Sequence, residues 1–322
     1  MKNVSASLIC LLVVLVGLPA SAQTIRRVNN TGISGTNIYA SVSDAIAAAA
    51  AGDVIQVEPS GAVYDGFTVS KNVTIVGPGY FLDPSQNPNL QANSLTATIG
   101  SMNVSSAITV SGLTFSGDIR VSANNFTIQR CNISRLFLDS KAPVTNLNIK
   151  QNYINILTDI YSSSSDNMLV SNNIIQTINY PTGYNGGFFN NVVLGSASIS
   201  NFFVTNNYFQ GSNFPSPTSN TFANNIGSVT NFPTTNGNQA NITQSAVFTL
   251  APGATAFDAW YQLKTGTNPA RGTGQLGVDV GAFGSTTPYK LGGVPAIPAI
   301  YQQTQTITGN SLNGTLSTRA NN

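Results

Sequence analysis

Two acidic residues occupy matching places in a repeated segment and could together hold a cation. When the segments around Asn132 and Asn152 are aligned on those asparagines, Asp139 and Asp159 each follow by seven residues. Two carboxylates about one strand spacing apart repel each other unless a cation or a shared proton relieves them. Calcium takes several oxygen ligands and suits such a pair, and the separation is also close to that of the carboxyl groups in retaining glycosidases. The pattern therefore predicts a calcium site at Asp139 and Asp159.

Two basic residues form a second column in the same alignment. Arg130 and Lys150 each precede the aligned asparagine by two residues. Clustered positive charge lowers the pKa of a cationic side chain, so either residue is a candidate catalytic base, and lysine gives up its proton more readily than arginine. The alternative is that both columns lie on solvated turns and faces, because loops of unequal length shift the columns. The third repeat favours that alternative, since its matching place holds Tyr180 and not a carboxylate.

Aromatic residues near the same asparagines are candidates for ligand binding. Tyr153 and Tyr208 each follow an aligned asparagine and are expected to point outward, and the intervening loop contributes Tyr180 and Tyr184. Aromatic faces that line a groove can stack on sugar rings while polar neighbours fix the orientation of the sugar. The alternative is that these rings pack beneath the long loop that precedes Phe202.

These side chains would be positioned by a strand-like repeat with a period near 20 residues. Each copy has alternating apolar residues, a short polar step, an asparagine and further apolar residues; the clearest copies span residues 126–133, 147–154, 168–175 and 202–209. A period this short with alternation of period two is typical of a coil of parallel strands in which each turn stacks on the last. We therefore predict an all-β fold, a right-handed parallel β-helix, with the handedness taken from the rule for parallel crossovers.

The aligned asparagines are expected to form an inward ladder along this coil. They lie at Asn132, Asn152, Asn173 and Asn207. Stacked amides can donate and accept along the stack, which satisfies polar groups that are costly to bury alone. The last step is longer than the others, so it contains either a long loop or an extra turn around Asn190 and Asn191.

The beginning of the chain predicts a cap on this coil. Residues Ile38–Ala51 read as a helix, with Ser41 or Ser43 as the N-cap and an alanine run that ends at Gly52. An exposed first turn would leave strand edges open to pairing with other chains. The helix is therefore expected to cover that edge.

Composition limits the functions available to the chain. It has 13 Lys and Arg, 11 Asp and Glu, and no histidine. Charge this sparse argues against nucleic acid as a partner, because such binding depends on Lys and Arg. The absence of histidine excludes Ser-His-Asp, Cys-His and histidine-ligated metal sites.

The first 22 residues have the pattern of a cleaved export signal. Lys2 precedes the apolar run Leu8–Leu18, and small residues follow up to Ala22. We therefore expect the protein to be secreted or held at the cell surface, and no other segment is apolar enough to predict a transmembrane helix. The remaining cysteine, Cys131, lies in a strand motif and is expected to be a buried thiol, with a reactive thiol as the alternative.

Several short motifs resemble those of secreted right-handed parallel β-helix proteins of the pectate-lyase-like superfamily that are common in Bacteroidetes. They are Tyr39–Ile46, Gly52-Asp53, Gly77–Gly79, Tyr261–Lys264, Asn268–Ala270, Gly277–Asp279 and Gly281–Gly284. The resemblance implies a β-helix and a location outside the cell. It also implies that an enzymatic member would be a lyase of acidic polysaccharides, with calcium on carboxylates and an arginine or lysine as base.

Two functions remain open, and the sequence favours the first. The first is a non-catalytic structural or polysaccharide-binding module, because the charged residues are few and no third carboxylate is in register. The second is a calcium-dependent polysaccharide lyase, or a glycoside hydrolase. The expected organisation is a signal peptide at 1–22, a capped β-helix at 23–284 and an exit segment at 285–322.

Overall fold

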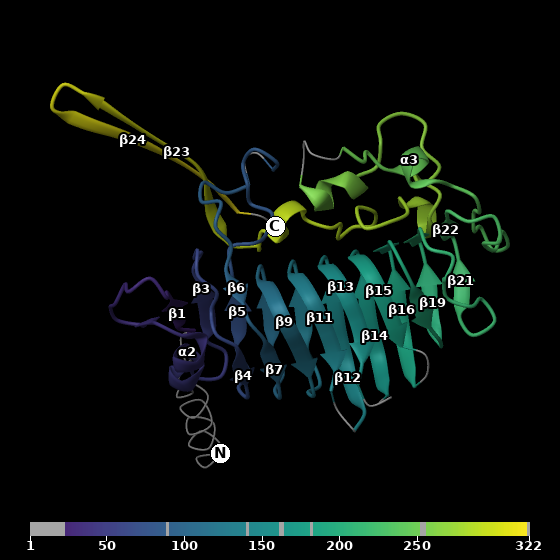
Figure 1. Cartoon of the computed structure of the whole chain (residues 1–322), viewed down its shortest axis with the longest axis horizontal. Coiled ribbons are helices and arrows are strands. Elements are labelled where there is room, and N and C mark those ends of the chain that lie inside the picture. Colours follow the sequence, from purple (N-terminus) through teal and green to yellow (C-terminus); the bar gives the residue numbers. More distant parts are fainter. Residues whose placement is uncertain are drawn as a thin grey trace, which may run out of the picture.

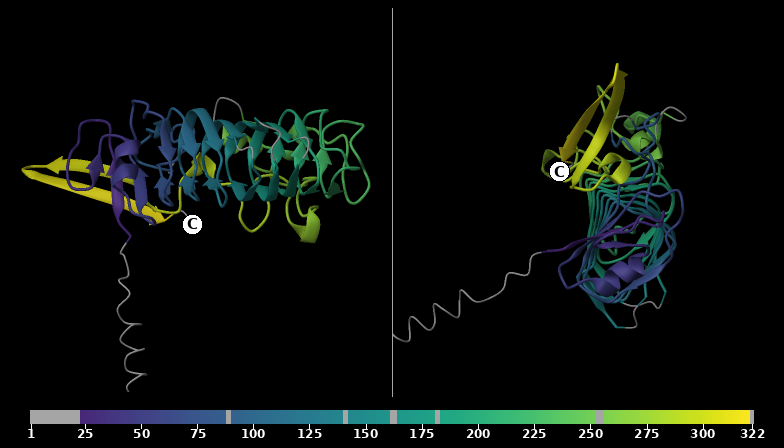
Figure 2. Two further views of the ribbon diagram at one scale, coloured as in Figure 1. Left: turned by 90° about the horizontal axis from the view of Figure 1, so that it is seen from below. Right: turned by 90° about the vertical axis from the view of Figure 1, so that its left-hand side faces the viewer.

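The chain folds as a parallel β-solenoid of about nine turns. The computed structural model describes residues 23–87, 90–139, 142–160, 164–180, 183–251 and 256–320, so the predicted export signal lies outside the described residues. The coil is elongated, and Figures 1 and 2 show the C-terminal part of the chain running back along one side of it before a hairpin projects from the opposite end. No helix in these ranges is long and apolar enough to cross a membrane. The right-handed sense of the coil stays a prediction.

Two parallel sheets form the walls of the coil, and we call them sheet A and sheet B. Sheet A contains, in spatial order, β2 (Ile38–Tyr39), β1 (Ile25–Val28), β3 (Val54–Val57), β5 (Thr74–Val76), β8 (Thr109–Ser111), β10 (Thr127–Gln129), β12 (Val144–Lys150), β14 (Ser165–Ser171), β16 (Tyr184–Phe189), β19 (Phe202–Thr205) and β21 (Thr221–Ala223). Sheet B contains, from the other end, β22 (Ile226–Gly227), β20 (Tyr208–Phe209), β17 (Val192–Val193), β15 (Ile174–Tyr180), β13 (Tyr153–Asp159), β11 (Asn132–Leu138), β9 (Thr114–Val121), β7 (Met102–Val104) and β4 (Phe67–Val69), with β18 (Ala197–Ile199) beside β15 and β6 (Thr98–Ile99) beside β9. Successive turns therefore stack strand on strand, as the period predicted.

A short helix caps the first turn. Helix α2 spans Val42–Ala48, which is shorter than the predicted helix, because the preceding Ile38–Tyr39 pairs as strand β2. Ser41 is the N-cap, and its hydroxyl accepts the backbone N–H of Asp44 at 3.1 Å. Val42, Ala45 and Ile46 are buried against the coil. The N-terminal edge of the solenoid is thereby covered.

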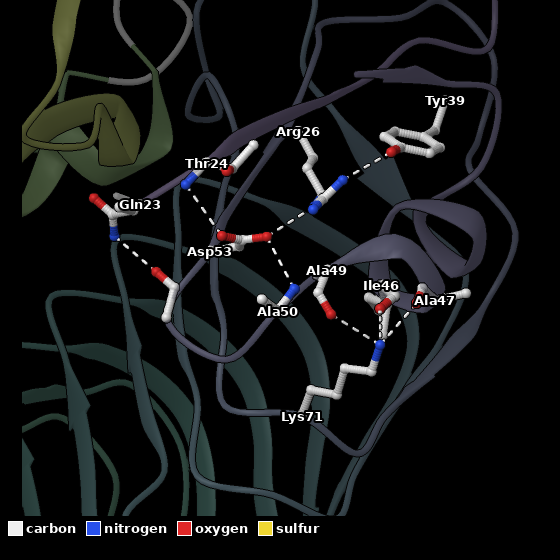
Figure 3. A network of polar contacts seen from close by, with 11 residues as sticks. Gln23, Thr24, Arg26, Tyr39, Ile46, Ala47, Ala49, Ala50, Asp53 and Lys71 are labelled. Atoms are coloured by element: carbon white, nitrogen blue, oxygen red, sulfur yellow. Dashed lines mark hydrogen bonds and ion pairs between the residues drawn. The ribbon is translucent and has the colours of Figure 1, made fainter. Parts of the chain in front are cut away.

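Charged side chains fasten this cap, as Figure 3 shows. The carboxylate of Asp53 accepts hydrogen bonds from the backbone N–H groups of Ala50 (2.9 Å) and Thr24 (3.1 Å) and from Nε of Arg26 (2.9 Å). These donors, Ala50 first, lower the pKa of Asp53 although its burial opposes the shift. Lys71 donates to three carbonyl groups at the C-terminal end of α2, where a positive charge is favourable.

A ladder of buried asparagines runs through the coil. Each side-chain amide donates to the Oδ1 of the next at 3.0 or 3.1 Å, and the members are Asn152, Asn173, Asn191, Asn207, Asn225 and Asn238. The prediction of an inward ladder is confirmed for Asn152, Asn173 and Asn207, and the extra turn near Asn191 exists. The prediction for Asn132 is wrong. Asn132 is half-buried and lies opposite Tyr153 in the register of β11 and β13. The residue that precedes Asn152 in the ladder is Cys131, whose backbone N–H donates to Oδ1 of Asn152.

The turn geometry explains this register. The residue before each ladder position has positive φ, a conformation that glycine and asparagine tolerate better than most residues; before Asn238 it is Gly237, and in the earlier turns the set is Arg130, Gln151, Asn172, Asn190, Asn206 and Asn224. We call this set the turn column. A left-handed residue followed by a ladder residue turns the chain from sheet A to sheet B. In the first of these turns the pair is Arg130 and Cys131, so the ladder position there holds a cysteine.

The turn column binds the returning C-terminal segment, residues 243–251 and 256–297. Gln151 donates to the carbonyl of Pro288 (2.7 Å), Asn172 to that of Gly284 (2.8 Å) and Asn190 to that of Asp279 (2.9 Å). The contacts thus move backward along the segment as the coil advances. The segment includes α3 (Gln244–Val247) and the 3₁₀ helices η1 (Phe257–Tyr261), η2 (Gln275–Gly277) and η3 (Leu291–Gly293).

Beneath this segment lies a second hydrophobic cluster, separate from the core inside the coil. It combines outward-facing residues of sheet B with side chains of the returning segment, among them Ile174, Val192, Tyr208, Ile226, Val247, Phe248, Tyr261 and Val280. The predicted domain boundary at 284 falls inside the returning segment. The chain then ends in an antiparallel hairpin of β23 (Pro298–Thr308) and β24 (Ser311–Ala320).

Candidate functional site

Four charged residues form an ion-pair cluster on the outward face of sheet B. Two come from β9, one from the middle of β11 and one from the residue that follows β11, and we call them the arginine–aspartate cluster: Asp118, Arg120, Arg135 and Asp139. The alternation of each strand places these side chains outward, because their neighbours Ile119, Leu136 and Leu138 point into the core. These four charged residues are joined by three ion pairs on one outward face of a chain that has few charges.

The cluster is linked by short ion pairs. Asp118 contacts Arg135 at 2.7 Å and Arg120 at 3.2 Å, and Arg120 also contacts Asp139 at 3.3 Å. The hydrogen bond to Asp139 is the largest cause that raises the pKa of Arg120, and Asp118 adds to it. The positively charged side chains are more exposed than the negatively charged ones: the arginines are 43% and 48% exposed and the aspartates 17% and 23%. The guanidinium groups therefore stand toward solvent, and the carboxylates lie beneath them.

An aromatic ring lies between the two arginines. Phe137 is half-buried, and the guanidinium carbons of Arg120 and Arg135 each lie 5.6 Å from its centroid. This distance is within the range of favourable cation–π contacts. The ring thus packs against both arginine side chains and limits the orientations of their guanidinium groups.

At the level of Arg120 and Phe137, the outward face of sheet B carries a row of side chains that are polar except for Phe137. In register order across the strands the row is Asn103, Arg120, Phe137, Thr158, Asn179 and Ser198. Neighbouring strands lie about 4.8 Å apart, so the row is roughly 24 Å long. Its members are exposed or half-buried. The result is a flat polar strip with the arginines near one end.

A bulge in β9 sets the position of Asp118. The register between β9 and β11 shifts between Ile133 and Arg135, so that two residues of β9 lie opposite one of β11. Gly117 lies in this bulge, and a Cβ atom there would meet the carbonyl oxygen of Gly100 at 2.1 Å. Bulges of this kind redirect a side chain. Here the bulge brings Asp118 opposite Arg135.

The structure does not bring the predicted calcium carboxylates together as a column. Leu138, not Asp139, lies opposite Asp159, so the predicted register is wrong by one residue. A shift of one residue sends a strand side chain to the other face. Asp139 binds Arg120 on the outside, whereas Asp159 accepts a hydrogen bond from the hydroxyl of Tyr184 at 3.0 Å. No group of three or more acidic or thiol side chains within the described ranges could hold a metal ion.

The two candidate bases also lie apart from these carboxylates. Arg130 precedes β11 and Asp139 follows its end, so the whole of β11, roughly 20 Å of extended strand, lies between them. Arg130 is buried and donates to Gln151 (3.0 Å) and to the carbonyl of Val294 (3.1 Å), and burial lowers its pKa. Lys150 lies opposite Gln129 and not opposite Arg130. The predicted stacking of the two bases is therefore wrong.

Three of the four candidate ligand-binding tyrosines are buried. Tyr180 and Tyr184 belong to the core inside the coil, with ring centroids 4.5 Å apart, and Tyr208 lies under the returning segment with its hydroxyl bonded to the carbonyl of Ile242. Tyr153 is half-buried beside Phe81 and Phe257. These rings are therefore packed inside the protein, as the alternative interpretation predicts, and do not line an exposed groove. Tyr208, however, is covered by the returning segment and not by the loop that precedes Phe202.

The fully buried Cys131 is expected to be unreactive in the folded protein. Burial raises the pKa of its thiol to about 12, so almost no thiolate exists near neutral pH. We expect the chain without residues 1–22 to react with a colorimetric thiol reagent only after denaturation, and then with one equivalent. Rapid labelling of the native protein would contradict the buried assignment.

No protein-family model, curated protein or solved structure matches this chain. The resemblance to the pectate-lyase-like superfamily thus depends on the short motifs and on the parallel coil.

Proposed function

We propose that the protein is an exported, non-catalytic solenoid that binds polysaccharide through the outward face of sheet B. The observation that carries the proposal is the arginine–aspartate cluster around Phe137, at one end of a flat polar strip. A surface of this shape suits an extended chain, since the spacing of its rungs is close to the repeat of successive sugar rings. Export is supported by the pattern of residues 1–22, and membership of the pectate-lyase-like superfamily is part of the same hypothesis.

The two aspartates balance the two arginines, but the guanidinium groups are the more exposed partners, and they suit a polysaccharide with carboxylate or sulfate groups. Each guanidinium has five N–H donors, and the ion pairs of Arg120 and Arg135 use only some of them. The remaining donors can bind an acidic group in a bidentate manner, which adds both strength and orientation. Thr158 and Asn179, farther along the strip, offer hydroxyl and amide groups to sugar hydroxyls.

The lyase hypothesis lacks the arrangement that it requires. Proton abstraction needs the base within hydrogen-bond reach of the carbon acid, while the metal holds the neighbouring carboxylate. Arg130 lies at the other end of β11 from Asp139, and its side chain binds the returning segment. Binding without cleavage is therefore the function that the geometry supports best.

Replacing Arg135 is expected to weaken polysaccharide binding by about tenfold, because a charge-assisted hydrogen bond is lost at a partly exposed site. The measurement is calorimetric titration of Arg135→Gln and the unaltered protein with polygalacturonate, alginate and a sulfated glycan, with a neutral glucan for comparison.

Arg27→Gln is the matched control. Arg27 is 49% exposed and ion-paired with Glu58, but it lies at the N-terminal cap. We expect this variant to bind like the unaltered protein. Equal losses for both variants, or no binding to any acidic glycan, would overturn the proposal.

A further inference from the structure

The C-terminal hairpin is a long element with almost no cover of its own. Strands β23 and β24 form ten opposed residue pairs joined by a tight turn, in which Gly309 adopts a φ of 60°. Within the two strands only Ala299 is buried. Figures 1 and 2 show the hairpin projecting beyond the N-terminal end of the coil, with its tip far from the solenoid.

A hairpin with so little cover is expected to need further contacts for stability. A lone two-stranded hairpin is marginally stable in water, and both of its edges present unpaired backbone groups. Natural edges are normally protected by charges, prolines or a cover. Here residues 302–318 contain neither a charged residue nor a proline. The solenoid, by contrast, covers its own N-terminal edge with α2.

The two faces of the hairpin differ in chemistry. The register places Ile307 opposite Leu312, Gln305 opposite Gly314, and Gln303 opposite Leu316 on one face, so three apolar side chains share it with two glutamines. These three apolar side chains are 79%, 68% and 60% exposed, respectively. The other face carries threonine, serine, glutamine and asparagine, including the opposed pair Thr306 and Asn313. We call the first the apolar face and the second the polar face.

We propose that this protein self-associates through its hairpins, with the apolar face of one copy packed on the apolar face of a second copy. A second copy fits because the surface is uncharged: two identical neutral faces meet without repulsion, whereas a charged partner would find no complementary charge. Two-fold pairing makes the same patch serve both partners. The projection of the hairpin also lets two tips meet without contact between the coils.

The size of the face limits the expected affinity. Eleven residues of strand span about 35 Å, and two strands with their side chains are about 10 Å wide, so each copy contributes a face of about 350 Å², which is smaller than a standard stable interface and suits a weak, transient contact. We therefore expect a reversible dimer with a dissociation constant in the micromolar range.

The test is analytical ultracentrifugation of the chain without residues 1–22, from about 1 to 200 μM. The expected result is a weight-average mass that rises from one copy toward two. The double variant Ile307→Lys with Leu312→Lys should weaken association by about a hundredfold, because it would place charges inside the interface. Both side chains are exposed in one copy, so the solenoid should fold normally, which circular dichroism would verify.

The matched control is Thr306→Lys with Asn313→Lys, which puts the same charges at the same level of the hairpin on its polar face. This variant is expected to dimerise like the unaltered protein. If both variants dissociate equally, packing through the apolar face is wrong, and if the unaltered protein stays a single copy throughout the range, the proposal is overturned.

Discussion

Replacing Asn173 with alanine is expected to lower the free energy of unfolding by roughly 3–5 kcal/mol, because several fully buried polar groups lose their partners at once. Oδ1 of Asn173 accepts both the backbone N–H and the side-chain amide of Asn152, at 2.9 and 3.0 Å. Its Nδ2 donates to the carbonyls of Ile149 and Ser171 and to Oδ1 of Asn191. Asn152, Asn173 and Asn191 are all fully buried, so solvent does not replace the lost partners. Urea unfolding followed by circular dichroism measures the change.

Asn132→Ala is the matched control for the ladder. Asn132 is also in the strand repeat, but its side chain is half-buried on the outward side, opposite Tyr153. A substitution there should change the free energy of unfolding by no more than about 0.5 kcal/mol. A loss for Asn132→Ala as large as that for Asn173→Ala would contradict the register described here.

The same pair of residues shows where sequence reasoning succeeds and where it fails. The parallel coil, the capping helix and most of the inward ladder follow from apolar alternation and the short period. The position of the first rung does not follow from matching asparagines, because the ladder residue there is Cys131. The correct register has a constant step of 21 residues, from Cys131 to Asn152 and from Asn152 to Asn173. The turn geometry, and not the residue type, defines that step.

The same error of one residue in register affects the predicted calcium site. A displacement of one residue in a strand moves side chains between the inside and the outside, so an alignment on asparagines pairs Asp139 with Asp159 although the two belong to different columns. The cluster that does form was recognisable in part from the sequence. Asp118 and Arg120 alternate with buried Ile119, which marks both as outward on one strand. The matching residue of the next strand, Arg135, depends on the bulge at Gly117, which alternation does not reveal.

The cover over sheet B depends on contacts that no local pattern encodes. Arg130 binds the carbonyl of Val294, which is 164 residues away in the chain. One sequence feature does point to a cover: the outward column that contains Ile174, Val192 and Ile226 is apolar, which would be unfavourable on a free surface. The returning segment resolves this by burying the column.

Within this cover, replacing Asp258 with asparagine is expected to remove a pH dependence of stability. Asp258 in η1 is fully buried, and its carboxylate accepts the backbone N–H of Gly292 at 2.7 Å and the hydroxyl of Tyr289 at 3.4 Å. Burial raises the pKa of Asp258 from 3.8 to about 6 in spite of these donors. The unfolded chain therefore loses this proton near pH 4, whereas the folded chain keeps it until about pH 6.

Because the pKa of Asp258 is higher in the folded chain than in the unfolded chain, the direction of the pH dependence of stability is fixed. The folded state binds more protons than the unfolded state between pH 4 and pH 6, so the contribution of Asp258 to stability falls as pH rises through this window. A shift of about two pKa units corresponds to about 3 kcal/mol, which is lost in full above about pH 6. The free energy of unfolding of Asp258→Asn, relative to that of the unaltered protein, should therefore increase by about 3 kcal/mol between pH 4 and pH 7.

Asp53→Asn provides a control with the opposite sign. Hydrogen bonds to Asp53, from the N–H of Ala50 first, lower its pKa in the folded state, so its contribution is present above the unfolded pKa and lost as pH falls. Relative to the unaltered protein, Asp53→Asn should thus become less stable as pH rises through the acidic range, while Asp258→Asn becomes more stable. Urea unfolding at intervals between pH 3.5 and pH 7.5 distinguishes the two slopes. A flat difference for Asp258→Asn would show that the carboxyl titrates alike in the folded and unfolded chains, and the returning segment would then be docked without a buried, protonated acid.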